Sequence, residues 1–329
     1  MNDSIRWGIV STARIAETAF IPALRAAGQR AILVGGRDLA RAQVFADRNG
    51  VESAVSGYDN VLQSPDVDAV YIPLPNSLHA EWTMRALEAG KAVLCEKPLC
   101  VSPEEVERVL ATARRTPGPL WEAFVFPYHR QHRRILEIVS AGMIGPLCDI
   151  TSEFHFNLTS TANIRLAPEL AGGALNDVGC YPVRFAQLVF DASPTAATAV
   201  AKWSEKDVDL QLEGVLECTE AHRLLISCGM TRDTGTFSRV IGEHGEIRAT
   251  NPFHARDFDT LEIRTGNEVT VEHVGNHEPT FAPALRHIQA VIRGDEQPRH
   301  TALDDSAATG TGLDVLRRSA RSGCRELVT

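Results

Sequence analysis

Short apolar runs alternate with helix-like segments over the first part of the chain. Runs typical of buried strands lie at residues 5–10, 31–36, 69–75, 92–95 and 120–126. Apolar residues at helical spacing lie between them, at residues 15–27, 39–48, 77–88 and 102–115. Strands joined to helices by connections of a few residues predict a parallel sheet with right-handed crossovers. The pattern therefore indicates an α/β domain, with Pro22 interrupting the first helix.

The pattern changes after residue 127. A helix-like segment at residues 128–141 precedes a series of β-like runs, which lie at residues 148–156, 195–203, 210–218, 223–228, 236–241, 246–249, 261–264 and 269–274. Successive strands separated by turns predict a large, mostly antiparallel sheet. If helices cover one face of this sheet, the other face is available for self-association. A final helix is expected at residues 304–322, before Gly323.

The turn after the first expected strand lies where dinucleotide-binding folds carry the fingerprint G-x-G-x-x-G. Only Gly8 is present, because Val10 and Ala13 occupy the other two glycine positions. Ala13 still permits close packing of the helix on the strand. The hydroxyl groups of Ser11 and Thr12 could help the helix amides to hold a pyrophosphate. An ordinary strand-to-helix turn is the alternative.

The end of the second expected strand bears on the choice of cofactor. An Asp or Glu about 20 residues after the glycine turn usually binds the ribose of NAD(H). This chain instead has Gly36, followed by Arg37 and Arg41. A small residue leaves space for a 2'-phosphate and arginines supply charge, so NADP(H) is predicted, with use of NAD(H) left open. Asp38 could bind a ribose hydroxyl, or it could cap the helix while the arginines face solvent.

Composition narrows the classes of function. The 329 residues, of which 44% are hydrophobic and 23% charged, suit a globular protein of two domains. A net charge of -9 without a Lys/Arg stripe argues against nucleic-acid binding. No apolar stretch reaches the length of a membrane span and the N-terminus lacks a secretory signal, so no membrane partner and a cytoplasmic location are expected.

Neither cysteines nor histidines indicate a metal site. The seven cysteines include no C-x-x-C pair, so neither a disulfide framework nor a zinc site is predicted. His129 and His132 are three residues apart, but no third ligand is evident. No metal is therefore expected.

Lys97 is a candidate for chemistry at a strand end. It follows the apolar run at residues 92–95 and precedes Pro98, which fixes the backbone and removes an amide donor. Strand ends face the ligand crevice of an open α/β sheet, so a lysine held there can act on a ligand. A solvated Lys-Pro turn is the alternative.

Asp177 and Tyr181 form a second candidate group. They lie four residues apart after Gly172 and Gly173, and they share one face if this segment is α-helical. A carboxylate and a phenol on one face suit hydroxyl recognition and proton transfer. A simple surface contact between residues four apart is the alternative.

Five motifs together resemble the Gfo/Idh/MocA oxidoreductases over nearly the whole chain. They are Gly8-Ile-Val-Ser-Thr-Ala13, Pro73-Leu-Pro-Asn-Ser-Leu-His79, Glu96-Lys-Pro98, Glu122-Ala-Phe124 and Gly172-Gly-Ala-Leu-Asn-Asp-Val-Gly-Cys-Tyr181. The resemblance implies a Rossmann dinucleotide-binding domain, expected at residues 1–124, and a C-terminal α+β domain for substrate binding and oligomerisation, expected at residues 125–329. The last helix could pack back on the first domain. A homodimer or homotetramer formed through the open sheet is expected.

The resemblance also implies hydride transfer between a nicotinamide and a sugar, keto-sugar or related substrate. Many members have His where this chain has Tyr181, and the tyrosine is more similar to keto-sugar reductases and dihydrodiol dehydrogenases than to inositol dehydrogenases. An NADP(H)-dependent sugar oxidoreductase is therefore predicted. The alternatives are a trans-dihydrodiol dehydrogenase acting on a cyclic diol and a non-catalytic NADP-binding sensor.

The resemblance, together with the turn and strand-end residues above, assigns residues to roles. The expected catalytic residues are Lys97, Tyr181 and Asp177, with the proton donor open between Lys97 and Tyr181. The expected cofactor-binding residues are Gly8, Ser11, Thr12, Ala13, Gly36, Arg37, Arg41, Pro73, Leu74, Asn76, His79, Glu96 and Lys97. The expected substrate-binding residues are Lys97, Phe124, His129, Asn163, Arg165, Asp177 and Tyr181.

Three of these expectations concern local structure. His79 is expected either to lie near the nicotinamide or to make a structural hydrogen bond at a helix N-terminus. Arg165 is expected either to reach the substrate or to form a salt bridge within its loop. The peptide bond before Pro98 is expected to be cis, as in related enzymes.

Overall fold

The chain divides into two compact units, which are described separately. The computed structural model describes residues 4–328 except residue 276. Residues 1–3, on which the prediction about a secretory signal partly rests, lie outside the described residues. The first unit comprises residues 1–100, 104–125 and 278–306, and the second comprises residues 101–103, 126–277 and 307–329. The chain thus leaves the first unit after residue 125, next to the expected boundary, and returns to it late in the sequence.

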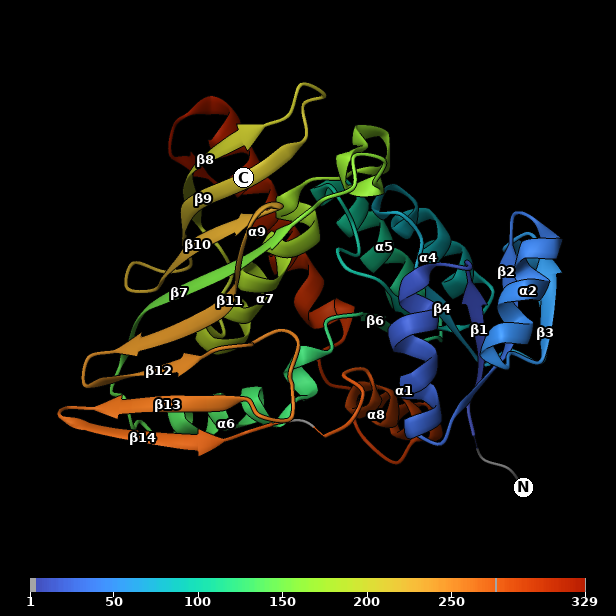
Figure 1. Ribbon diagram of the computed structural model, residues 1–329, viewed down its shortest axis with the longest axis horizontal. Coiled ribbons are helices and arrows are strands. Elements are labelled where there is room, and N and C mark those ends of the chain that lie inside the picture. The colour runs from blue at the N-terminus through green and yellow to red at the C-terminus, as the bar shows by residue number, and fades with distance from the viewer. Residues whose placement is uncertain (1–3, 276, 329) are drawn as a thin grey trace. The chain divides into compact units, whose positions relative to one another are not determined.

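The first unit is built on a six-stranded parallel sheet. Its strands are β1 (Arg6–Val10), β2 (Arg30–Gly36), β3 (Ser53–Ser56), β4 (Ala69–Ile72), β5 (Ala92–Cys95) and β6 (Leu120–Glu122). They lie in the order β3-β2-β1-β4-β5-β6, and all neighbouring strands are parallel (Figure 1). The order reverses between β1 and β4, and ligands of such sheets bind beyond the carboxyl ends of the strands at this point. The sequence pattern predicted each of these strands except β3.

Helices connect the strands of the first unit. They are α1 (Ile21–Ala26), α2 (Leu39–Asn49), α3 (Asp59–Leu62), α4 (His79–Glu88), α5 (Pro103–Arg115) and α8 (Ala282–Arg293). A π-helical turn (Ala16–Phe20) precedes α1, and Pro22 lies in the first turn of α1. Proline is tolerated there because the first amides of a helix have no partner within the helix. The interruption expected at Pro22 is therefore a change from a π turn to an α-helix.

The helix α8 belongs to the first unit although it lies late in the chain. The side-chain amide of Gln29 donates to the carbonyl oxygen of Leu285 at 2.9 Å. The ring of Phe281, just before α8, lies 6.2 Å from that of Phe20 and 6.1 Å from that of Tyr71. α1 and α8 lie side by side (Figure 1). Residues 278–306 therefore complete the core of this unit, which the sequence pattern did not predict.

Two glycines allow α3 to lie close to the sheet. A Cβ atom on Gly8 would come within 2.5 Å of one methyl carbon of Val61, and a Cβ atom on Gly35 within 2.7 Å of the other. Val61 is fully buried, so it has little space in which to move. Gly8, the first glycine of the expected fingerprint, thus has a packing role on this face of the sheet.

The second unit is built on a nine-stranded sheet. Its strands are β7 (Leu147–Asn157), β8 (Ala196–Trp203), β9 (Asp209–Glu217), β10 (Arg223–Gly229), β11 (Thr231–Gly242), β12 (Gly245–Ala249), β13 (Thr260–Thr265), β14 (Glu268–His273) and β15 (Glu326–Leu327). Their order is β14-β13-β12-β11-β7-β10-β9-β8-β15. Only the pair β7 and β10 is parallel among these neighbours. The sheet is therefore largely antiparallel, as predicted, with the short edge strand β15 in addition.

Helices cover one face of this sheet. They are α6 (Arg130–Ser140), α7 (Cys180–Phe190) and α9 (Ala302–Ser322), whose residues up to Ser306 belong to the first unit. α7 packs on β7 and β10, and Arg134 of α6 pairs with Glu272 of β14 at 2.7 Å (Figure 1).

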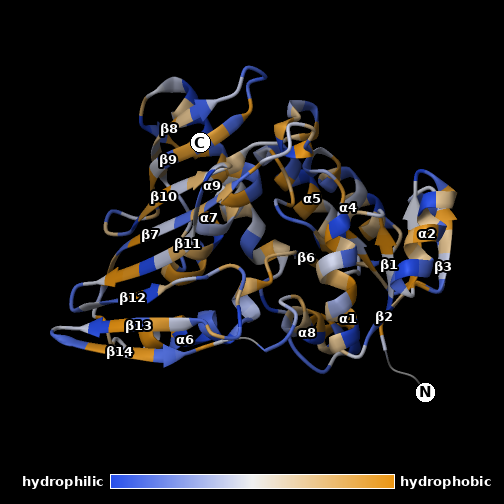
Figure 2. Cartoon of the chain, in the orientation of Figure 1, coloured by the Kyte–Doolittle hydropathy of each residue, from blue (hydrophilic) through white to orange (hydrophobic). Residues whose placement is uncertain are grey.

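The strands alternate in hydropathy along their length (Figure 2). In β8, Ala197 and Ala199 are buried, whereas Thr198 and Val200 are exposed on the opposite face. This is the alternation of a sheet that is covered on one side.

Within the part of the chain that the structure describes, no helix combines the length and apolar character needed to cross a bilayer. The same residues contain no group of three His, Cys, Asp or Glu side chains arranged to hold a metal ion. All seven cysteines are free thiols.

Gly8→Ala should lower the free energy of unfolding by about 1–3 kcal/mol, because the added methyl group forces Val61 or α3 to shift. Chemical denaturation measures this change. Val61→Ala is the control, because it removes the methyl groups that would clash. If the clash is the cause, the double variant loses less stability than the sum of the two single variants. Additive losses would show that another effect of the substitution dominates.

Candidate active site

Lys97 lies in a tight turn directly after β5 and is partly exposed. The peptide bond between Lys97 and Pro98 is cis, as the resemblance implied. The amide of Glu96 donates to the carbonyl oxygen of Ile72 at 3.1 Å, and the hydroxyl of Tyr71 donates to the carboxylate of Glu96 at 2.6 Å. Both partners lie on the neighbouring strand β4. The residue before Lys97 is therefore held to the sheet through its backbone and through its side chain.

Glu122 holds the residue that follows the cis bond. The amide of Leu99 donates to Oε1 of Glu122 at 2.8 Å, and the hydroxyl of Ser306 donates to Oε2 at 2.6 Å. Glu122 ends β6 and is buried. A buried carboxylate with hydrogen bonds to both oxygens is a firm anchor, because breaking either bond leaves a charged acceptor without its partner. The turn that carries Lys97 is thus fixed from β4 on one side and from β6 on the other.

His79, the first residue of α4, joins this turn to the loop after β4. Its side chain is fully buried, with Nδ1 2.7 Å from the carbonyl oxygen of Pro98 and Nε2 2.7 Å from that of Leu74. Burial lowers the pKa of the imidazole, and the nearby Lys97 charge lowers it further. The neutral ring has one N–H, so it donates to one of the two carbonyl groups at a time. Of the two roles expected for His79, the structure shows the structural hydrogen bond. Both ring nitrogens face backbone carbonyl groups, so His79 can influence a cofactor only through the backbone that it holds.

The turn after β1 brings the fingerprint residues to the carboxyl end of the sheet. Ser11 has a backbone φ of 146°, a value that residues with side chains rarely adopt. The carbonyl oxygen of Ala13 accepts from the amide of Ala16 at 3.1 Å, which starts the helical segment. The methyl carbon of Thr12 lies 3.6 Å from where a Cβ atom of Gly36 would be. Ser11, Thr12 and Gly36 therefore lie at one end of the sheet, where β1 and β2 finish.

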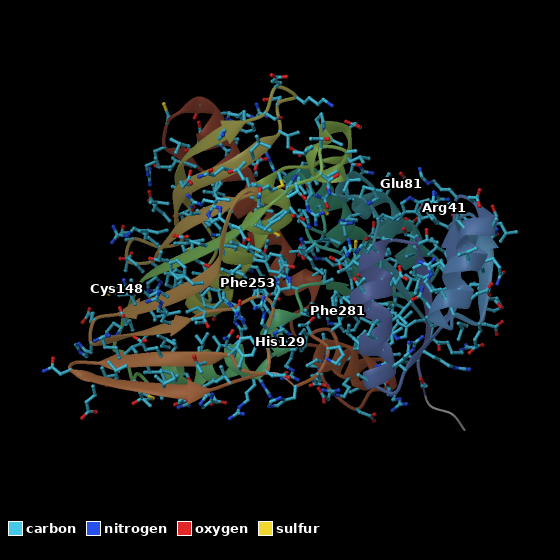
Figure 3. All side chains as sticks on the ribbon, in the orientation of Figure 1. Arg41, Glu81, His129, Cys148, Phe253 and Phe281 are labelled. Carbon is cyan, nitrogen blue, oxygen red and sulfur yellow. The ribbon has the colours of Figure 1, made fainter. Side chains whose placement is uncertain are left out.

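The N-terminal end of α2 presents Arg37 and Arg41, which are both exposed. The carboxylate of Asp38 accepts from the backbone amide of Arg41 at 2.9 Å and caps the helix. The capping alternative for Asp38 is therefore the one observed. Arg41 is labelled on α2 in Figure 3.

A pocket of about 410 Å³ lies beside this helix end. It is lined by Thr12, Glu17, Ala40, Arg41, Val44, Phe45 and Arg48. Glu17 and Arg48 pair with each other at 3.4 Å, so their charges offset and Arg41 makes the pocket positive. A guanidinium group and a hydroxyl at the end of β2 are suited to the 2'-phosphate of NADP(H). The residues present therefore fit this cofactor.

Asp177, in the second unit, lies in a different local structure from the expected α-helix. Leu175–Gly179 form a π-helical turn, which α7 continues. Because a π turn is wider than an α-helical turn, a spacing of four residues does not by itself place Asp177 and Tyr181 on one face.

The Asp177 carboxylate is held by an arginine. It pairs with Nε of Arg165 at 2.6 Å, and the amide of Arg165 donates to the side chain of Asn163 at 3.0 Å. The salt bridge expected as the alternative for Arg165 is thus present. Asn163, Arg165 and Asp177 form one connected polar group.

Tyr181, in the first turn of α7, is partly exposed and lies among aromatic rings. The ring centroids of Phe253, Phe154 and His254 lie 5.2, 5.3 and 5.7 Å from that of Tyr181. Phe253 is buried in this unit (Figure 3), whereas His254 is exposed. None of these three was predicted as a site residue. Phe253 and His254 lie in an irregular loop without hydrophobic periodicity, so no sequence signal marks them.

Two of the expected substrate residues are buried. Phe124 is 4% exposed and His129 is 1% exposed. His132, one turn after His129, bonds through Nε2 to the carbonyl oxygen of Pro252, and its ring lies 4.7 Å from that of Phe126. These two histidines belong to the core of the second unit, where they shape the interior.

The described structure gathers the expected residues into a separate group in each unit. In the first unit they lie at the carboxyl ends of the strands, in the turns that follow and in the first turn of α2; they are Ser11, Thr12, Gly36, Arg37, Arg41, Leu74 and Lys97. In the second unit they lie in the segment before α7 and in its first turn; they are Asn163, Arg165, Asp177 and Tyr181.

His79→Ala should lower the free energy of unfolding by about 2–4 kcal/mol, because the imidazole N–H no longer donates to either of the two buried carbonyl groups and a cavity remains. His79→Gln should lose less, since its amide N–H can still donate to one of these carbonyls. Chemical denaturation measures both changes. The exposed His254→Ala is the matched control and should cost less than about 0.5 kcal/mol. An equal loss in His79→Ala and His254→Ala would show that the buried hydrogen bonds contribute little.

Comparison with known protein families gives two matches along the chain. Residues 5–124 match the GFO_IDH_MocA model, described as an oxidoreductase family with an NAD-binding Rossmann fold. Residues 132–248 match the GFO/IDH/MocA C-terminal domain. Together the two matches cover more than half of the chain.

Individual relatives match over almost their whole length. The dTDP-3,4-didehydro-2,6-dideoxy-alpha-D-glucose 3-reductase of Saccharopolyspora spinosa is 40% identical over 325 residues, which are 97% of this chain and 96% of that protein. D-xylose 1-dehydrogenase (NADP(+)) 2 of Haloferax volcanii is 32% identical over 325 residues, covering 96% and 98%. The structure of KijD10, a 3-ketoreductase from Actinomadura kijaniata in complex with NADP and TDP-benzene, gives a TM-score of 0.88 at 31% identity, covering 96% of this chain and 98% of that one. This chain therefore belongs to the Gfo/Idh/MocA family of oxidoreductases, with an N-terminal NAD-binding Rossmann fold.

Proposed function

We propose that the protein is an NADP(H)-dependent oxidoreductase that interconverts a carbonyl and a hydroxyl group on a sugar or sugar-like substrate. The observation that carries the proposal is the fixed turn around Lys97, which Glu122, Tyr71 and His79 hold at the carboxyl end of the sheet. A solvated surface turn would not need three buried or half-buried anchors from separate elements. Two relatives named as a xylose dehydrogenase and a reductase of a dTDP-linked glucose derivative support the sugar-type substrate. The xylose dehydrogenase and the KijD10 complex, which both name NADP, support the cofactor.

NADP(H) is proposed rather than NAD(H) because of the residues at the end of β2. Arg41 places a positive charge in the pocket beside Thr12. Asp38 caps α2, and the carboxylate of Glu17 in the pocket pairs with Arg48. A cationic site whose carboxylates are engaged in this way favours a 2'-phosphate over a free 2'-hydroxyl.

When bound, the nicotinamide cofactor supplies or accepts the hydride. In the direction of reduction, Tyr181 donates its phenolic proton to the substrate oxygen, and the Lys97 ammonium stabilises the negative charge that develops there. Asp177, held by Arg165, orients a substrate hydroxyl.

A sugar-type substrate suits the second unit because polar and aromatic groups lie close together in its sequence and structure. The pair Asp177 and Arg165 can form hydrogen bonds with hydroxyl groups. Tyr181, Phe154 and the exposed His254 offer ring surfaces for the less polar face of a sugar. Binding sites commonly combine aromatic walls with a few fixed polar groups in this way.

The proposal includes a cytoplasmic location and self-association. Seven free thiols suit a reducing compartment. The exposed face of the nine-stranded sheet carries apolar side chains such as Val200, which is 65% exposed, and Leu225. We propose that two copies cover this face in a homodimer or a larger homo-oligomer.

Lys97→Met should reduce turnover by at least about 10³-fold, because the charge that stabilises the substrate oxygen is lost. NADPH affinity, measured by the change in NADPH fluorescence, should change by less than about threefold, since the anchors of the turn remain. The assay uses a panel of keto-sugars with NADPH and of aldoses with NADP. Lys206→Met, at an exposed lysine, is the matched control. Near-normal turnover in Lys97→Met would overturn the assignment of Lys97 as a catalytic residue. If the unmodified protein binds NADPH tightly but turns over no substrate of the panel, the alternative of a non-catalytic NADP-binding sensor is favoured.

Arg41→Gln should weaken NADPH binding by about 10-fold or more and leave NADH binding nearly unchanged, because the lost charge faces only the 2'-phosphate. The helix cap should survive, since it uses the backbone amide of Arg41. Fluorescence titration with both cofactors measures the two affinities. Arg48→Gln, in the same pocket but paired with Glu17, should have a smaller effect. Equal weakening for NADPH and NADH would contradict the assignment of Arg41.

A further inference from the structure

Two charged residues with little access to solvent lie against the segment that leads to Asp177 and Tyr181. Asp209 is the first residue of β9 and is 8% exposed. Arg317 lies on α9, and burial of its guanidinium lowers its pKa, an effect that the charge of Asp209 opposes. Removing charged groups from water is costly unless hydrogen bonds and opposite charges compensate. The contacts of these two residues show where that compensation comes from.

Asp209 holds the start of the π-helical turn. Its Oδ2 accepts from the amide of Leu175 at 2.6 Å. Its Oδ1 lies so close to Gly173 that a Cβ atom there would be 2.1 Å away. Gly173 also has a φ of 113°, which glycine adopts readily and other residues do not. The glycine in this motif is therefore required by the approach of a carboxylate from β9 as well as by its own backbone conformation.

Arg317 holds the next residue of the turn. Its Nη2 donates to Oδ1 of Asn176 at 2.7 Å. The side-chain nitrogen of Asn176 donates in turn to the carbonyl oxygens of Ala171 at 3.0 Å and Gly172 at 3.3 Å. Asn176 is buried and directly precedes Asp177. The guanidinium group thus fixes the side chain that closes residues 171–176 into a compact turn.

We propose that Asp209 and Arg317 are positioning residues, which hold residues 171–176 from β9 and from α9 and thereby set the backbone that presents Asp177 and Tyr181. The inference rests on the proposed function for the roles of Asp177 and Tyr181. The hold itself consists of hydrogen bonds within the second unit and can be measured without a substrate.

The charge of Asp209 makes this hold sensitive to pH. Burial raises the pKa of Asp209 to about 6, although the Leu175 amide and the Arg317 guanidinium act in the opposite direction. The ionisable groups that face its carboxyl are Arg317 from α9 and the Cys228 thiol from β10. When the turn opens, the carboxyl regains water and its ordinary, lower pKa, so protonation favours the arrangement in which Asp209 is buried against the turn. The hold on the turn should therefore tighten as the pH falls through about 6.

The test is hydrogen exchange, read by mass spectrometry on a peptide covering residues 171–181 in the full chain with NADPH present. Asp209→Ala, which removes the acceptor for the Leu175 amide, and Arg317→Gln should each speed exchange in this peptide by about 10-fold. Arg318→Gln is the matched control, because Arg318 is the next residue of α9 and pairs instead with Asp314 and Glu326. This control should leave exchange in the peptide unchanged. NADPH affinity should stay within about threefold in all three variants.

A pH series separates positioning from a general loss of stability. After correction for intrinsic exchange rates, the unmodified protein should gain protection in residues 171–181 as the pH falls, with a midpoint near pH 6, and Asp209→Ala should lack this transition. If a substrate turns over, Asp209→Ala should lower kcat by about 10-fold with KM within about threefold. Unchanged exchange in both Asp209→Ala and Arg317→Gln would overturn the inference. If Arg317→Gln does not fold, the exchange and pH profile of Asp209→Ala decide it. Absence of turnover in the unmodified protein counts against the proposed function and leaves the exchange result to stand.

Discussion

A lysine side chain is long and flexible, so it can act at one place only if its backbone is held still. In this protein the hydrogen bonds around residues 96–99 supply that constraint. Glu122 fixes the Leu99 amide, Tyr71 fixes the Glu96 carboxylate, and His79 bonds the backbone beyond the cis peptide. These anchors come from β6, β4 and α4, so the position of Lys97 depends on the strands on both sides of β5 and on α4. The proposed chemistry of the first unit therefore depends on the completeness of its fold.

The sequence was most informative where burial imposes a simple pattern. β4 and β5 are buried on both faces, so each is a continuous apolar run that is easily recognised. β3 and α3 were missed because residues 51–62 mix polar residues and glycine, and their place depends on the fit of Val61 against Gly8 and Gly35. α8 joins the first unit through contacts such as that between Gln29 and Leu285, which are 256 residues apart. No local pattern can report a partner at that distance.

The same distinction applies to the candidate site. Motifs located Lys97, Asp177 and Tyr181, because these residue types recur at fixed places in related chains. The side chains that hold them come from remote elements, as Asp209 on β9 and Arg317 on α9 illustrate. The π-helical turn at Leu175–Gly179 was likewise not predicted, because the spacing of the residues in this segment is that expected of an α-helix.

The late return of residues 278–306 affects the synthesis of the protein. Phe281 packs against Phe20 and Tyr71, and Ser306 bonds to Glu122, so the first unit lacks part of its core until the ribosome has made almost the whole chain. Between residues 125 and 306, at about 5–20 residues per second, this delay lasts roughly 10–40 seconds. A stop codon at residue 278 would therefore remove part of the core of the dinucleotide-binding unit, together with residues 307–329 of the second unit.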